Sequence, residues 1–563
     1  MRRRSVIRIG LAAWGLAGAI AIWGVAGLPP RPAPPVGMPV ASDVRVAYHV
    51  HTRASDGTGT IETVAAAAQR AGLAAVIVTD HGDGTRAVPP PRYVSKVLVV
   101  EGAEISTWAG HYVALGAAPA PYPLGGEPAA VVDDVHRLGG LGLAAHPGSA
   151  KEALKWRDWD ASFDGLEWLN ADSEWRDRPR DLWRSLVTYP WRPVETITAL
   201  LDRPAFELAQ WDRLTARRPV AGLVAHDAHA RLGVRGVGEP YDGAVALSVP
   251  SYAAIFAAFS NVARLERPLT GDAAADAVAL VHALGTGRSY GVVTGIAPSG
   301  HVRFTATAAG ASAGMGEHLA PTGPVVLTFA ADAPAGARAT LLCNGRVVAE
   351  GDGGQVAWTT ASAPGACRVE VTTLRGDTRV PWLFTNPIYV RDVLAAPSPQ
   401  DLATAKLVLP VAWSGDADKW QPELAPGASG RAAAVPGHPR RVAFTWQLGS
   451  EAEQHAALRL DIKAPDLTGF DRLVVRASAD RPMRAWLQLR TPQGSGQRWG
   501  RSVYLDPTMR EIPVSLDSLL ALDGASTPVP LADVTALLIV VDTVHTRPGT
   551  AGTIYFDELW KAR

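Results

Sequence analysis

The sequence contains very little cysteine, and this limits the chemistry that it can carry. Only Cys343 and Cys367 occur in 563 residues, and both lie in one later segment that is rich in β-branched residues. Neither is near the histidine motifs described below, which argues against a zinc site with cysteine ligands. In an exported compartment the pair could form a disulfide; two free buried thiols are the alternative.

The sequence also lacks net charge, because 54 Lys and Arg residues balance 54 Asp and Glu residues. Overall charge therefore does not favour nucleic acid or another polyelectrolyte as a partner. A basic channel studded with aromatic residues is missing, so there is no specific nucleic-acid-binding signal. No glycine-rich phosphate loop follows the first apolar run, which disfavours a doubly wound nucleotide-binding sheet.

Charged residues are absent from 9–28, which follow Arg2, Arg3, Arg4 and Arg8 and precede a proline-rich stretch. A helix of that length spans about 30 Å, the thickness of a bilayer core. We therefore expect membrane attachment through an N-terminal signal anchor. A cleaved signal peptide, and hence a secreted protein, is the alternative. In both cases the rest of the chain faces the periplasm or the extracellular side.

At this length we expect about three or four domains. The predicted division is a signal anchor with a proline-rich linker over 1–40, an α/β domain over 41–295, and two all-β domains over 296–391 and 392–563.

Short apolar runs alternate with helical stretches in the α/β domain. Two such stretches are 61–71, capped by Thr60, and 128–138; a third begins after a cap at Asp272. Strands that alternate with helices predict parallel pairing in a closed or nearly closed βα barrel. The expected strands lie within 44–50, 74–79, 97–100, 112–115, 141–145, 166–169 and 220–225.

The two later segments alternate β-branched residues with turns. Asn344-Gly345 between apolar runs predicts a hairpin, and 296–391 is typical of an immunoglobulin-like β-sandwich. About eight strands in 392–563 favour a jelly-roll or galactose-binding-like β-sandwich. Exposed tryptophans there would stack on sugars, so a glycan or a protein is a candidate ligand of the β-domains. We nevertheless expect five tryptophans in the core: Trp413, Trp420, Trp446, Trp486 and Trp499.

Polar residues gather at the ends of the apolar runs of the α/β domain. His49 and His51 would share one face of a strand, and in a βα barrel the C-terminal strand ends meet at one rim. His111 is the exception, because it begins its run. Six imidazoles and three carboxylates exceed the needs of one ion and predict two or three divalent ions, of zinc, manganese or iron. The candidate ligands are His49, His51, Asp56, His81, Glu104, His111, His146, Asp227 and His229.

Six ordered motifs carry these residues: HVHTRASDG at 49–57, TDH at 79–81, GAEIST at 102–107, GHY at 110–112, AHP at 145–147 and DAH at 227–229. Over about 250 residues this pattern resembles the PHP (polymerase and histidinol phosphatase) superfamily. The resemblance implies a distorted seven-stranded, TIM-like βα barrel with a trinuclear metal site.

The resemblance also implies how the ligands divide. One ion would be held by His49, His51, Glu104 and Asp227, a second by Glu104, His111 and His146, and a third by Asp56, His81 and His229. Glu104 is then the bridge, and the match to GAEIST selects it over Glu101. Glu104, Asp227 and His229 are the residues assigned to catalysis.

Three further polar residues receive other expectations. His226 departs from the family, in which a small residue precedes the aspartate, and should point away from Asp227, with either a packing or a surface position. His136 is expected to be structural. Asp80 either supports the neighbouring ligands or caps the end of its strand.

The expected reaction is hydrolysis of a phosphomonoester, nucleotide or oligonucleotide, with a hydroxide shared between metals as the nucleophile. Arg53, Lys151 and Arg231 follow ligand motifs and could bind substrate anions; solvated rim charges are the alternative. Two other functions stay open. One is hydrolysis of a carbamate or carboxylic ester, as in exported PHP-like hydrolases of the carbaryl-degrading type. The other is a cell-envelope binding protein with structural metals.

Overall fold

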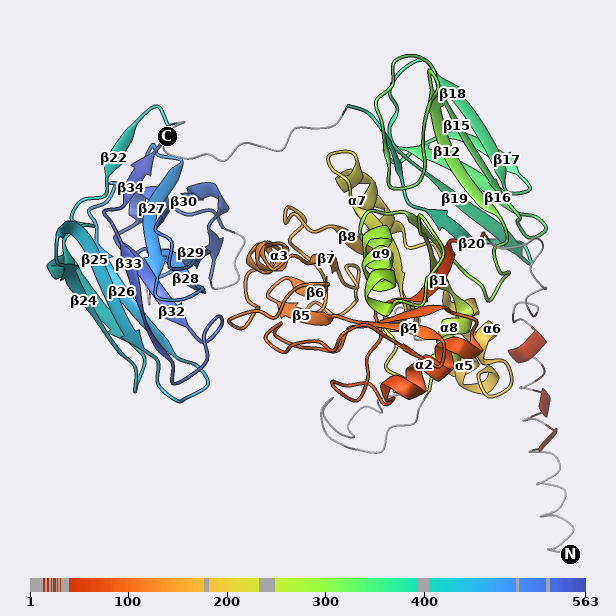
Figure 1. The fold of residues 1–563 in the computed structure, drawn as a ribbon, viewed down its shortest axis with the longest axis horizontal. Helices are drawn as coiled ribbons and strands as arrows, with labels where there is room; N and C mark the ends of the chain where they lie inside the picture. Colours follow the sequence, from red (N-terminus) through yellow and green to blue (C-terminus); the bar gives the residue numbers. More distant parts are fainter. Residues whose placement is uncertain are drawn as a thin grey trace, which may run out of the picture. The chain divides into compact units, whose positions relative to one another are not determined.

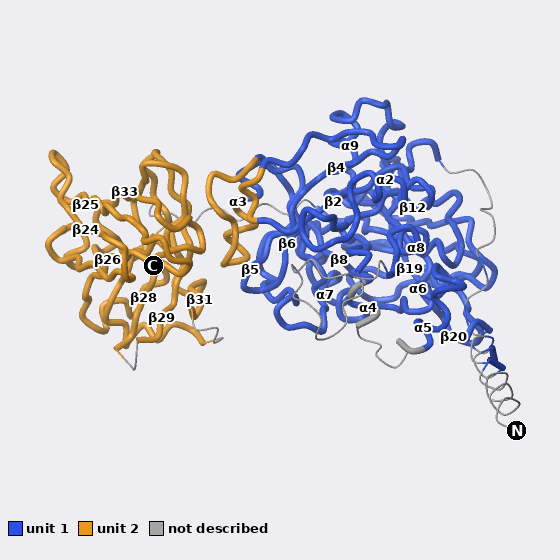
Figure 2. Tube along the Cα trace, turned by 90° about the horizontal axis from the view of Figure 1, so that it is seen from below, with its two compact units in different colours: residues 1–82, 87–118, 135–394 blue, residues 83–86, 119–134, 395–563 orange. Residues whose placement is uncertain are grey.

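The computed structural model describes residues 40–176, 182–231, 249–392, 405–492, 496–522 and 527–563, with a few single positions before residue 40. The chain divides into two compact units (Figure 2). Unit 1 comprises Met1–Gly82, Ala87–Ala118 and Val135–Leu394, and unit 2 comprises Asp83–Arg86, Pro119–Asp134 and Ala395–Arg563. Within the described residues no helix has both the length and the apolarity needed to cross a membrane. The anchor expected over 9–28 lies mostly outside those residues and stays a prediction.

Unit 1 opens with a mixed α/β region that contains two sets of parallel strands (Figure 1). The predicted runs all become strands, and their side chains are buried almost throughout, as expected for strands covered on both faces. One parallel set is β1 (Asp43–Ala47), β2 (Ala75–Val78) and β4 (Val97–Glu101). The other is β7 (Leu141–Ala144), β8 (Gly165–Asn170) and β9 (Ala221–Ala225).

The expectation of uniformly parallel pairing is wrong for the strands between and beside these sets. β5 (Ala103–Thr107) and β6 (Gly110–Leu115) form an antiparallel hairpin, because a two-residue connection cannot join parallel strands. β6 is also antiparallel to β7. β3 (Arg92–Val94), β10 (Ser260–Arg264) and β11 (Ser289–Val292) add further antiparallel pairs at the edges of the first set.

Two isolated parallel bridges link the sheets just beyond the strand ends. Val50 pairs with Ala228, and His81 pairs with Glu104. The Glu104 amide donates to the Asp80 carbonyl, and the His51 amide donates to the Ala228 carbonyl. The C-terminal ends of strands from both sheets are therefore held side by side.

Helices connect the strands of this region. The predicted caps are confirmed: Thr60 accepts from the Thr63 amide at the start of α2, and Asp272 accepts from the Ala274 and Ala275 amides at the start of α9. The described helices are α2 (Ile61–Arg70), α3 (Pro128–Arg137), α4 (Ala171–Arg176), α5 (Leu182–Thr188), α6 (Pro193–Leu200), α7 (Ala205–Thr215), α8 (Tyr252–Ala258) and α9 (Ala273–Gly285).

The rest of unit 1 is an antiparallel β-sandwich with a continuous apolar core between its sheets. Asn344 and Gly345 form the predicted hairpin turn, both with positive φ. A disulfide joins Cys343 to Cys367 on neighbouring strands. One sheet contains β12 (Val302–Ala308), β13 (Ala311–Ala313), β15 (Val325–Ala331) and β18 (Gln355–Thr360); the other contains β14 (His318–Leu319), β16 (Arg338–Cys343), β17 (Arg346–Asp352), β19 (Gly365–Arg375), β20 (Thr378–Thr385) and β21 (Ile388–Val390). β20 pairs with β11, so the second sheet continues into the α/β region.

Unit 2 is a second antiparallel β-sandwich, with a large apolar core shared by its two sheets. The seven-stranded sheet contains β22 (Val408–Pro410), β24 (Ser429–Val435), β25 (His438–Gln447), β27 (Arg472–Ala479), β30 (Arg510–Ser515), β33 (Ala551–Phe556) and β34 (Trp560–Ala562). The six-stranded sheet contains β23 (Trp420–Leu424), β26 (His455–Asp461), β28 (Met483–Arg490), β29 (Arg498–Leu505), β31 (Leu520–Ala521) and β32 (Ala536–Asp542).

Four of the five tryptophans expected in the core are buried; the expectation was wrong for Trp413, which is 63% exposed. Trp413 lies in a turn between β22 and β23 and has positive φ, so it has no strand face on which to point inward.

Unit 2 also contains two short segments from within the predicted α/β domain. The buried Arg484 of β28 donates to both carboxylate oxygens of Asp134 and to Asp133. Glu127 accepts from the Ser502 amide at 2.9 Å. These bonds explain why Pro119–Asp134 belongs to unit 2. The division into domains ending at 40, 295, 391 and 563 stays a prediction.

Candidate metal centre

The ends of the strands in the α/β region bring all nine predicted ligands into one cluster. His49 and His51 follow β1, His81 follows β2, His146 follows β7, and Asp227 follows β9. The other members are Asp56, Glu104, His111 and His229. The site therefore lies where the strands of both sheets end.

His111 joins the cluster because its strand runs the other way. It stands at the start of β6, which is antiparallel to both β5 and β7. The beginning of β6 therefore lies at the same rim as the ends of the parallel strands. This pairing accounts for the one apparent exception in the sequence pattern.

The backbone is irregular where the ligands are presented. φ is +62° at His49, +30° at His146 and +43° at Asp227, in the region that non-glycine residues rarely adopt. β1 ends at Ala47, so His49 and His51 do not share a regular strand face as the sequence predicted. Their Nε2 atoms still lie 3.1 Å apart, because the left-handed turn at His49 brings the rings together. Such strain is commonly retained at functional sites.

Glu104 is the centre of the cluster and is only 1% exposed. Its Oε1 lies 2.7 Å from His111 Nδ1 and 2.9 Å from His146 Nε2. Its Oε2 lies 3.1 Å from the Nε2 atoms of His49 and His51, and 3.3 Å from His81 Nδ1. Glu101, the alternative, instead pairs with Arg92 at 2.8 Å.

The remaining ligands form two flanks of this centre. Asp56 Oδ2 lies 3.1 Å from His229 Nε2 and 3.8 Å from His81 Nε2. Asp227 Oδ1 lies 3.4 Å from His51 Nε2 and 3.6 Å from His49 Nε2. The sets Asp56–His81–His229 and His49–His51–Glu104–Asp227 are thus each brought together, as are the two imidazoles on Oε1 of Glu104.

Burial and close approach shift the pKa values of the cluster strongly. Burial alone would lower the pKa of His51, but hydrogen bonds with Asp227 and Glu104 raise it to about 10. Burial would raise the pKa of Glu104, yet His49, with hydrogen bonds from His111 and His146, holds it well below its usual range. The buried carboxylates are therefore ionised and favour positive charge at the imidazoles that contact them.

These donors fit divalent cations. Glu167 Oε1 lies 2.5 Å from His49 Nδ1, a contact that holds a proton on that nitrogen and directs Nε2 at the other candidate ligands. This Nε2 faces His51 Nε2 and the oxygens of Glu104 and Asp227. Burial alone would lower the pKa of His49, but Glu167, Asp227 and Glu104 raise it well above its usual value, so positive charge is favoured here, and a divalent cation could supply it in place of the imidazole proton. The mixture of imidazole and carboxylate suits zinc, iron or manganese.

Sequence reasoning missed the residues that orient the ligands. Besides holding His49, Glu167 of β8 accepts from the His146 amide at 2.7 Å and from Asn170 Nδ2 at 2.9 Å. Asn170 also donates to Asp227 Oδ2 at 3.2 Å. A carboxylate behind a ligating histidine is the usual outer support of a metal site. The available clue was a charged residue inside the otherwise apolar run at 165–170.

Asp80 supports the loop that carries His51 and Asp56. It accepts from the Thr52 amide at 2.7 Å, from the Thr52 hydroxyl at 2.6 Å and from the Ser55 hydroxyl at 2.6 Å. Ser55 Oγ in turn lies 3.4 Å from His51 Nδ1. Of the two roles considered for Asp80, this is support of the neighbouring ligands.

The other predicted histidines lie where they were expected. His226 is fully buried, stacks on Phe259 with ring centroids 4.5 Å apart, and contacts the Phe259 carbonyl through Nε2. Burial lowers its pKa to about 4. His136 is on α3 and pairs with Asp164.

The three candidate substrate residues lie at or near the surface. Arg53 and Lys151 are exposed and Arg231 is half-buried. Arg53 Nε donates to the Thr58 carbonyl at 2.7 Å. Their role in substrate binding stays a prediction.

No protein-family model and no curated protein matches this chain. Among solved structures, a family 11 carbohydrate-binding module from Clostridium thermocellum, in complex with a β-1,3-1,4-mixed-linked tetrasaccharide, is 12% identical, with a TM-score of 0.22. It covers 26% of this chain and 88% of its own. An exo-β-agarase is 11% identical, with a TM-score of 0.21, and covers 28% of this chain and 25% of its own. At TM-scores this low the likeness assigns neither ligand nor activity to this chain.

Proposed function

We propose that the α/β region of unit 1 is a distorted seven-stranded barrel of the PHP type and that it hydrolyses phosphate esters with bound metal ions. The observation that carries the proposal is the convergence of five imidazoles on the two oxygens of Glu104. A buried carboxylate with so many imidazole partners is suited to bridge cations.

The chain offers three neighbouring places for ions, with Glu104 shared by two of them. Bound divalent ions would lower the pKa of a coordinated water toward about 7 and would offset the charge of a phosphate ester. The protein's own contribution is to fix the ligands. Glu167 holds His49 and His146, Asp80 holds the loop of His51, and Asn170 holds Asp227.

Asp227 and His229 are the candidates for proton transfer. The Asp227 carboxylate is 6% exposed and already accepts from Asn170, whereas the His229 side chain is 21% exposed. His229 Nε2 contacts Asp56 and its Nδ1 contacts the Asp227 carbonyl at 3.0 Å. We assign His229 the transfer of a proton to the leaving group in the form with two ions bound, in which its Nε2 would be free of metal, because it is the member of the pair that substrate and solvent can reach.

We propose that the enzyme acts outside the cytoplasm, held to the membrane by its N-terminal segment. The apolar run at 9–28 supports this location, and so does the disulfide between Cys343 and Cys367. Disulfides persist mainly in oxidising compartments.

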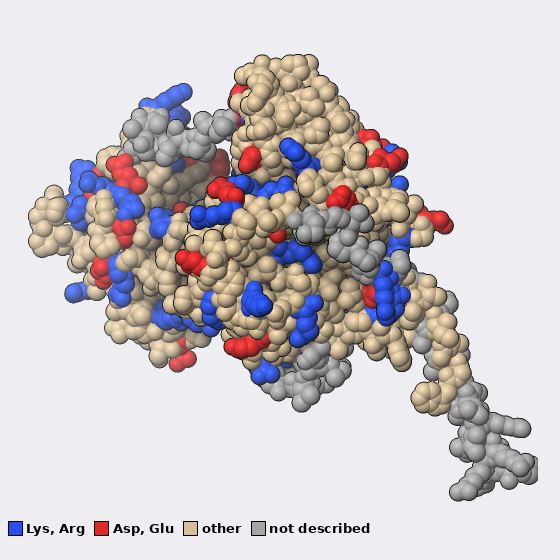
Figure 3. Space-filling view, turned by 45° about the vertical axis from the view of Figure 1, so that its right-hand side comes forward, with Lys and Arg blue, Asp and Glu red and all other residues tan. Residues whose placement is uncertain are grey.

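The test is a hydrolysis screen of the purified full chain loaded in turn with Zn²⁺, Mn²⁺ and Fe²⁺. Substrates should include phosphomonoesters, phosphodiesters, nucleotides, a short oligonucleotide, aryl carbamates and carboxylic esters. We expect turnover of a phosphate ester, with metal bound at two or three equivalents per chain. On the face drawn in Figure 3, basic and acidic side chains are interspersed over the described surface, so small esters are the first choice.

His51→Ala tests whether the cluster carries the activity, and His282→Ala, an exposed histidine on α9, is the matched control. We expect the first to lose at least about 1,000-fold in kcat/KM and the second to keep full activity. Turnover of carbamates without phosphate esters would favour the carbonyl chemistry. No turnover of any ester with metals demonstrably bound would contradict hydrolysis and leave a binding protein with structural metals.

A further inference from the structure

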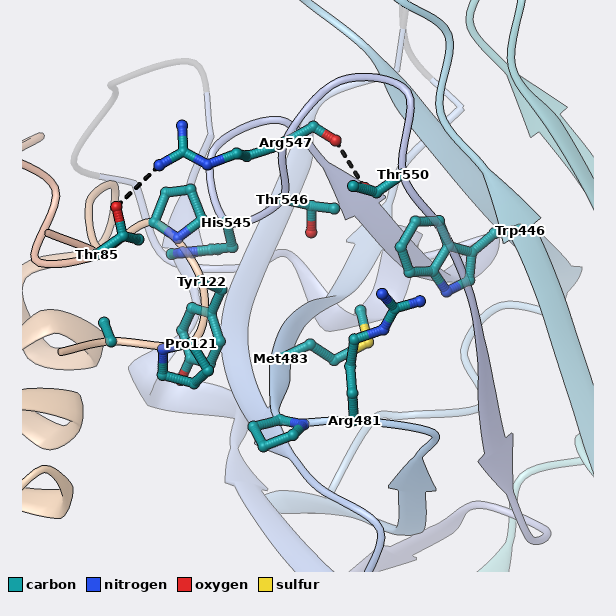
Figure 4. A pocket seen from close by; sticks show the side chains of 13 residues that line it. Thr85, Pro121, Tyr122, Trp446, Arg481, Met483, His545, Thr546, Arg547 and Thr550 are labelled. Carbon is teal, nitrogen blue, oxygen red and sulfur yellow. Dashed lines mark hydrogen bonds between the residues drawn. The ribbon is translucent and has the colours of Figure 1, made fainter.

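Unit 2 contains a cavity of about 220 Å³ whose lining includes none of the candidate metal ligands (Figure 4). All of its lining residues belong to unit 2. Pro121 and Tyr122 come from the segment before α3, Trp446 comes from β25, and Met483 begins β28. The rest of the wall includes residues that follow β32.

Three buried side-chain groups of the residues that line this cavity have no hydrogen-bond partner among the described residues: the indole Nε1 of Trp446, the hydroxyl of Thr546 and Nδ1 of His545. Trp446 is 2% exposed and Thr546 is 9% exposed. In Figure 4 the Thr546 hydroxyl points into the space between Tyr122 and Arg481. A buried polar group without a partner costs about 1–3 kcal/mol, so each such group calls for an explanation.

The indole of Trp446 requires a hydrogen-bond acceptor, and the Thr546 hydroxyl requires a donor or an acceptor; the described residues provide neither. Trp446 turns its Nε1 edge toward the Arg481 guanidinium, which lies 6.0 Å from the centre of its ring (Figure 4). Indole and guanidinium both only donate hydrogen bonds. A molecule with acceptor oxygens would satisfy Trp446, while Thr546 could donate or accept.

The charges around the cavity are already balanced. Arg481 Nε donates to Asp480 at 3.2 Å, and its Nη2 donates to the Ala551 carbonyl. Arg547 donates to Asp83 at 2.9 Å and to Thr85 at 2.8 Å. Burial keeps His545 neutral at physiological pH by lowering its pKa to about 3. The cavity therefore favours an uncharged ligand over an anion.

Proline, tyrosine and methionine side chains supply apolar surface opposite these donors. The combination suits a molecule with an apolar face and a rim of oxygens, which is the character of a pyranose ring. The volume is below the roughly 300–1,000 Å³ of pockets for drug-sized ligands, and so suits a single ring. We infer that this cavity binds one sugar residue of an uncharged polysaccharide, with Trp446 and Thr546 as its hydrogen-bond partners.

The test measures binding of the full chain to soluble β-glucan, xylan and galactan by affinity electrophoresis and titration calorimetry. Polygalacturonate serves as the anionic comparison. We expect one of the three neutral polysaccharides to bind and polygalacturonate to bind at least 10-fold more weakly.

Trp446→Phe and Thr546→Val each remove one unpartnered polar group, but only Thr546→Val keeps the shape of the side chain. We expect each to weaken binding at least 10-fold. Thermal stability should stay equal or rise in Thr546→Val, because a buried unsatisfied group is lost, and should fall in Trp446→Phe, because the smaller ring leaves a cavity in the core. The result for Thr546→Val therefore separates a ligand contact from simple misfolding.

Trp413→Ala is the control, since Trp413 is the exposed tryptophan of unit 2 and the competing platform for a sugar. We expect it to leave binding unchanged. The inference is overturned if none of the neutral polysaccharides binds, if the anionic one binds better, or if Trp413→Ala abolishes binding that Trp446→Phe and Thr546→Val retain.

Discussion

Each unit of this protein buries a charged side chain almost completely, but the two charges have opposite surroundings. In unit 1, Glu104 is 1% exposed and faces five imidazoles that crowd onto its two oxygens. In unit 2, Arg484 is 3% exposed, and its nitrogens meet the carboxylates of Asp133 and Asp134 and the carbonyls of Ala130 and Ser502. The guanidinium nitrogens of Arg484 meet hydrogen-bond acceptors. Around Glu104, in contrast, three imidazole nitrogens crowd onto one carboxylate oxygen.

The difference distinguishes a structural ion pair, around Arg484, from a candidate ligand-binding site, around Glu104. Matched partners satisfy a buried charge within the fold. Around Glu104 the imidazole nitrogens point at one another as well as at carboxylates, and backbone strain at His49, His146 and Asp227 keeps them there. Such an arrangement supports our proposal that cations bind among these residues.

The largest expected effect comes from removing Glu104, the proposed bridge between cations. Glu104→Ala should lose metal, measured as equivalents per chain by elemental analysis, and should lower kcat/KM by at least about 1,000-fold. The fold should persist, because removing the carboxylate also removes the need for positive charge in the cluster.

Glu101→Ala is the matched control for this variant, three residues away and paired with Arg92. It should keep both metal and activity. If Glu101→Ala were the variant that lost metal, Glu104 would be the wrong bridge and the contrast with Arg484 would fail.

Arg484 should behave in the opposite way. Arg484→Met removes the cation of a buried ion pair and leaves the buried Asp134 carboxylate without the charge that balances it, although Tyr122 still donates to it, so the variant should destabilise unit 2 by about 3–5 kcal/mol. Metal content should not change. Differential scanning calorimetry measures the loss of stability, and elemental analysis measures the metal content.

Arg440→Met is the control, because Arg440 pairs with Glu558 at the surface with its side chain 69% exposed. An exposed pair contributes about 0–1 kcal/mol, so this variant should be nearly neutral. Equal destabilisation by both variants would show that the burial of Arg484 has no special effect.

The sequence correctly predicted helix caps and a hairpin turn, which depend on only a few neighbouring residues. Thr60 and Asp272 cap their helices, and Asn344-Gly345 forms its hairpin, because each depends on hydrogen bonds or φ values within one turn. The nine clustered residues were also found, since seven of them follow the ends of apolar runs and the other two, Asp56 and His111, belong to the same ordered set of motifs. Their function as ligands stays a prediction.

One local feature and several that depend on distant segments were not predicted. The local one is the antiparallel β5–β6 hairpin, which brings His111 to the rim and follows from a two-residue connection. Pro119–Asp134 belongs to unit 2 because of Arg484 and Ser502, more than 300 residues later. Glu167 was missed because a run such as 165–170 is typical of an ordinary buried strand.

Glu167 tests whether residues that support the candidate ligands, without belonging to the cluster themselves, affect metal binding. Glu167→Gln keeps the shape of the side chain but removes the charge behind His49 and the strong acceptor for the His146 amide. Metal affinity should fall by about 10–100-fold, as is usual when an outer partner of a ligating histidine is changed. Competition with a chromophoric chelator measures the affinity. Glu152→Gln, an exposed glutamate near the same rim, should leave it unchanged.

The smallest effect concerns His545, a buried histidine of unit 2 whose pKa is lowered, whereas the pKa of His51 beside Glu104 is raised. His545 faces Arg484, the Ser502 hydroxyl and the Trp486 ring, and burial with the nearby guanidinium lowers its pKa to about 3. The folded state therefore stays neutral at His545 between pH 6.5 and about 3, while the unfolded state takes up a proton. Stability must fall as pH falls through this range, by at most about 1.4 kcal/mol per pH unit.

Asp542 on β32 acts in the opposite direction in the same unit. Burial raises its pKa to about 6, so between about pH 6 and 3.8 the folded state keeps a proton that the unfolded state loses, and stability rises as pH falls. His545→Gln should expose this second effect by removing the first. The variant should lose less stability than the wild type when calorimetry is repeated at pH 7, 6 and 5, whereas His438→Gln, at an exposed position of β25, should follow the wild type. Parallel loss in all three proteins would mean that acid acts on unit 2 through groups other than His545.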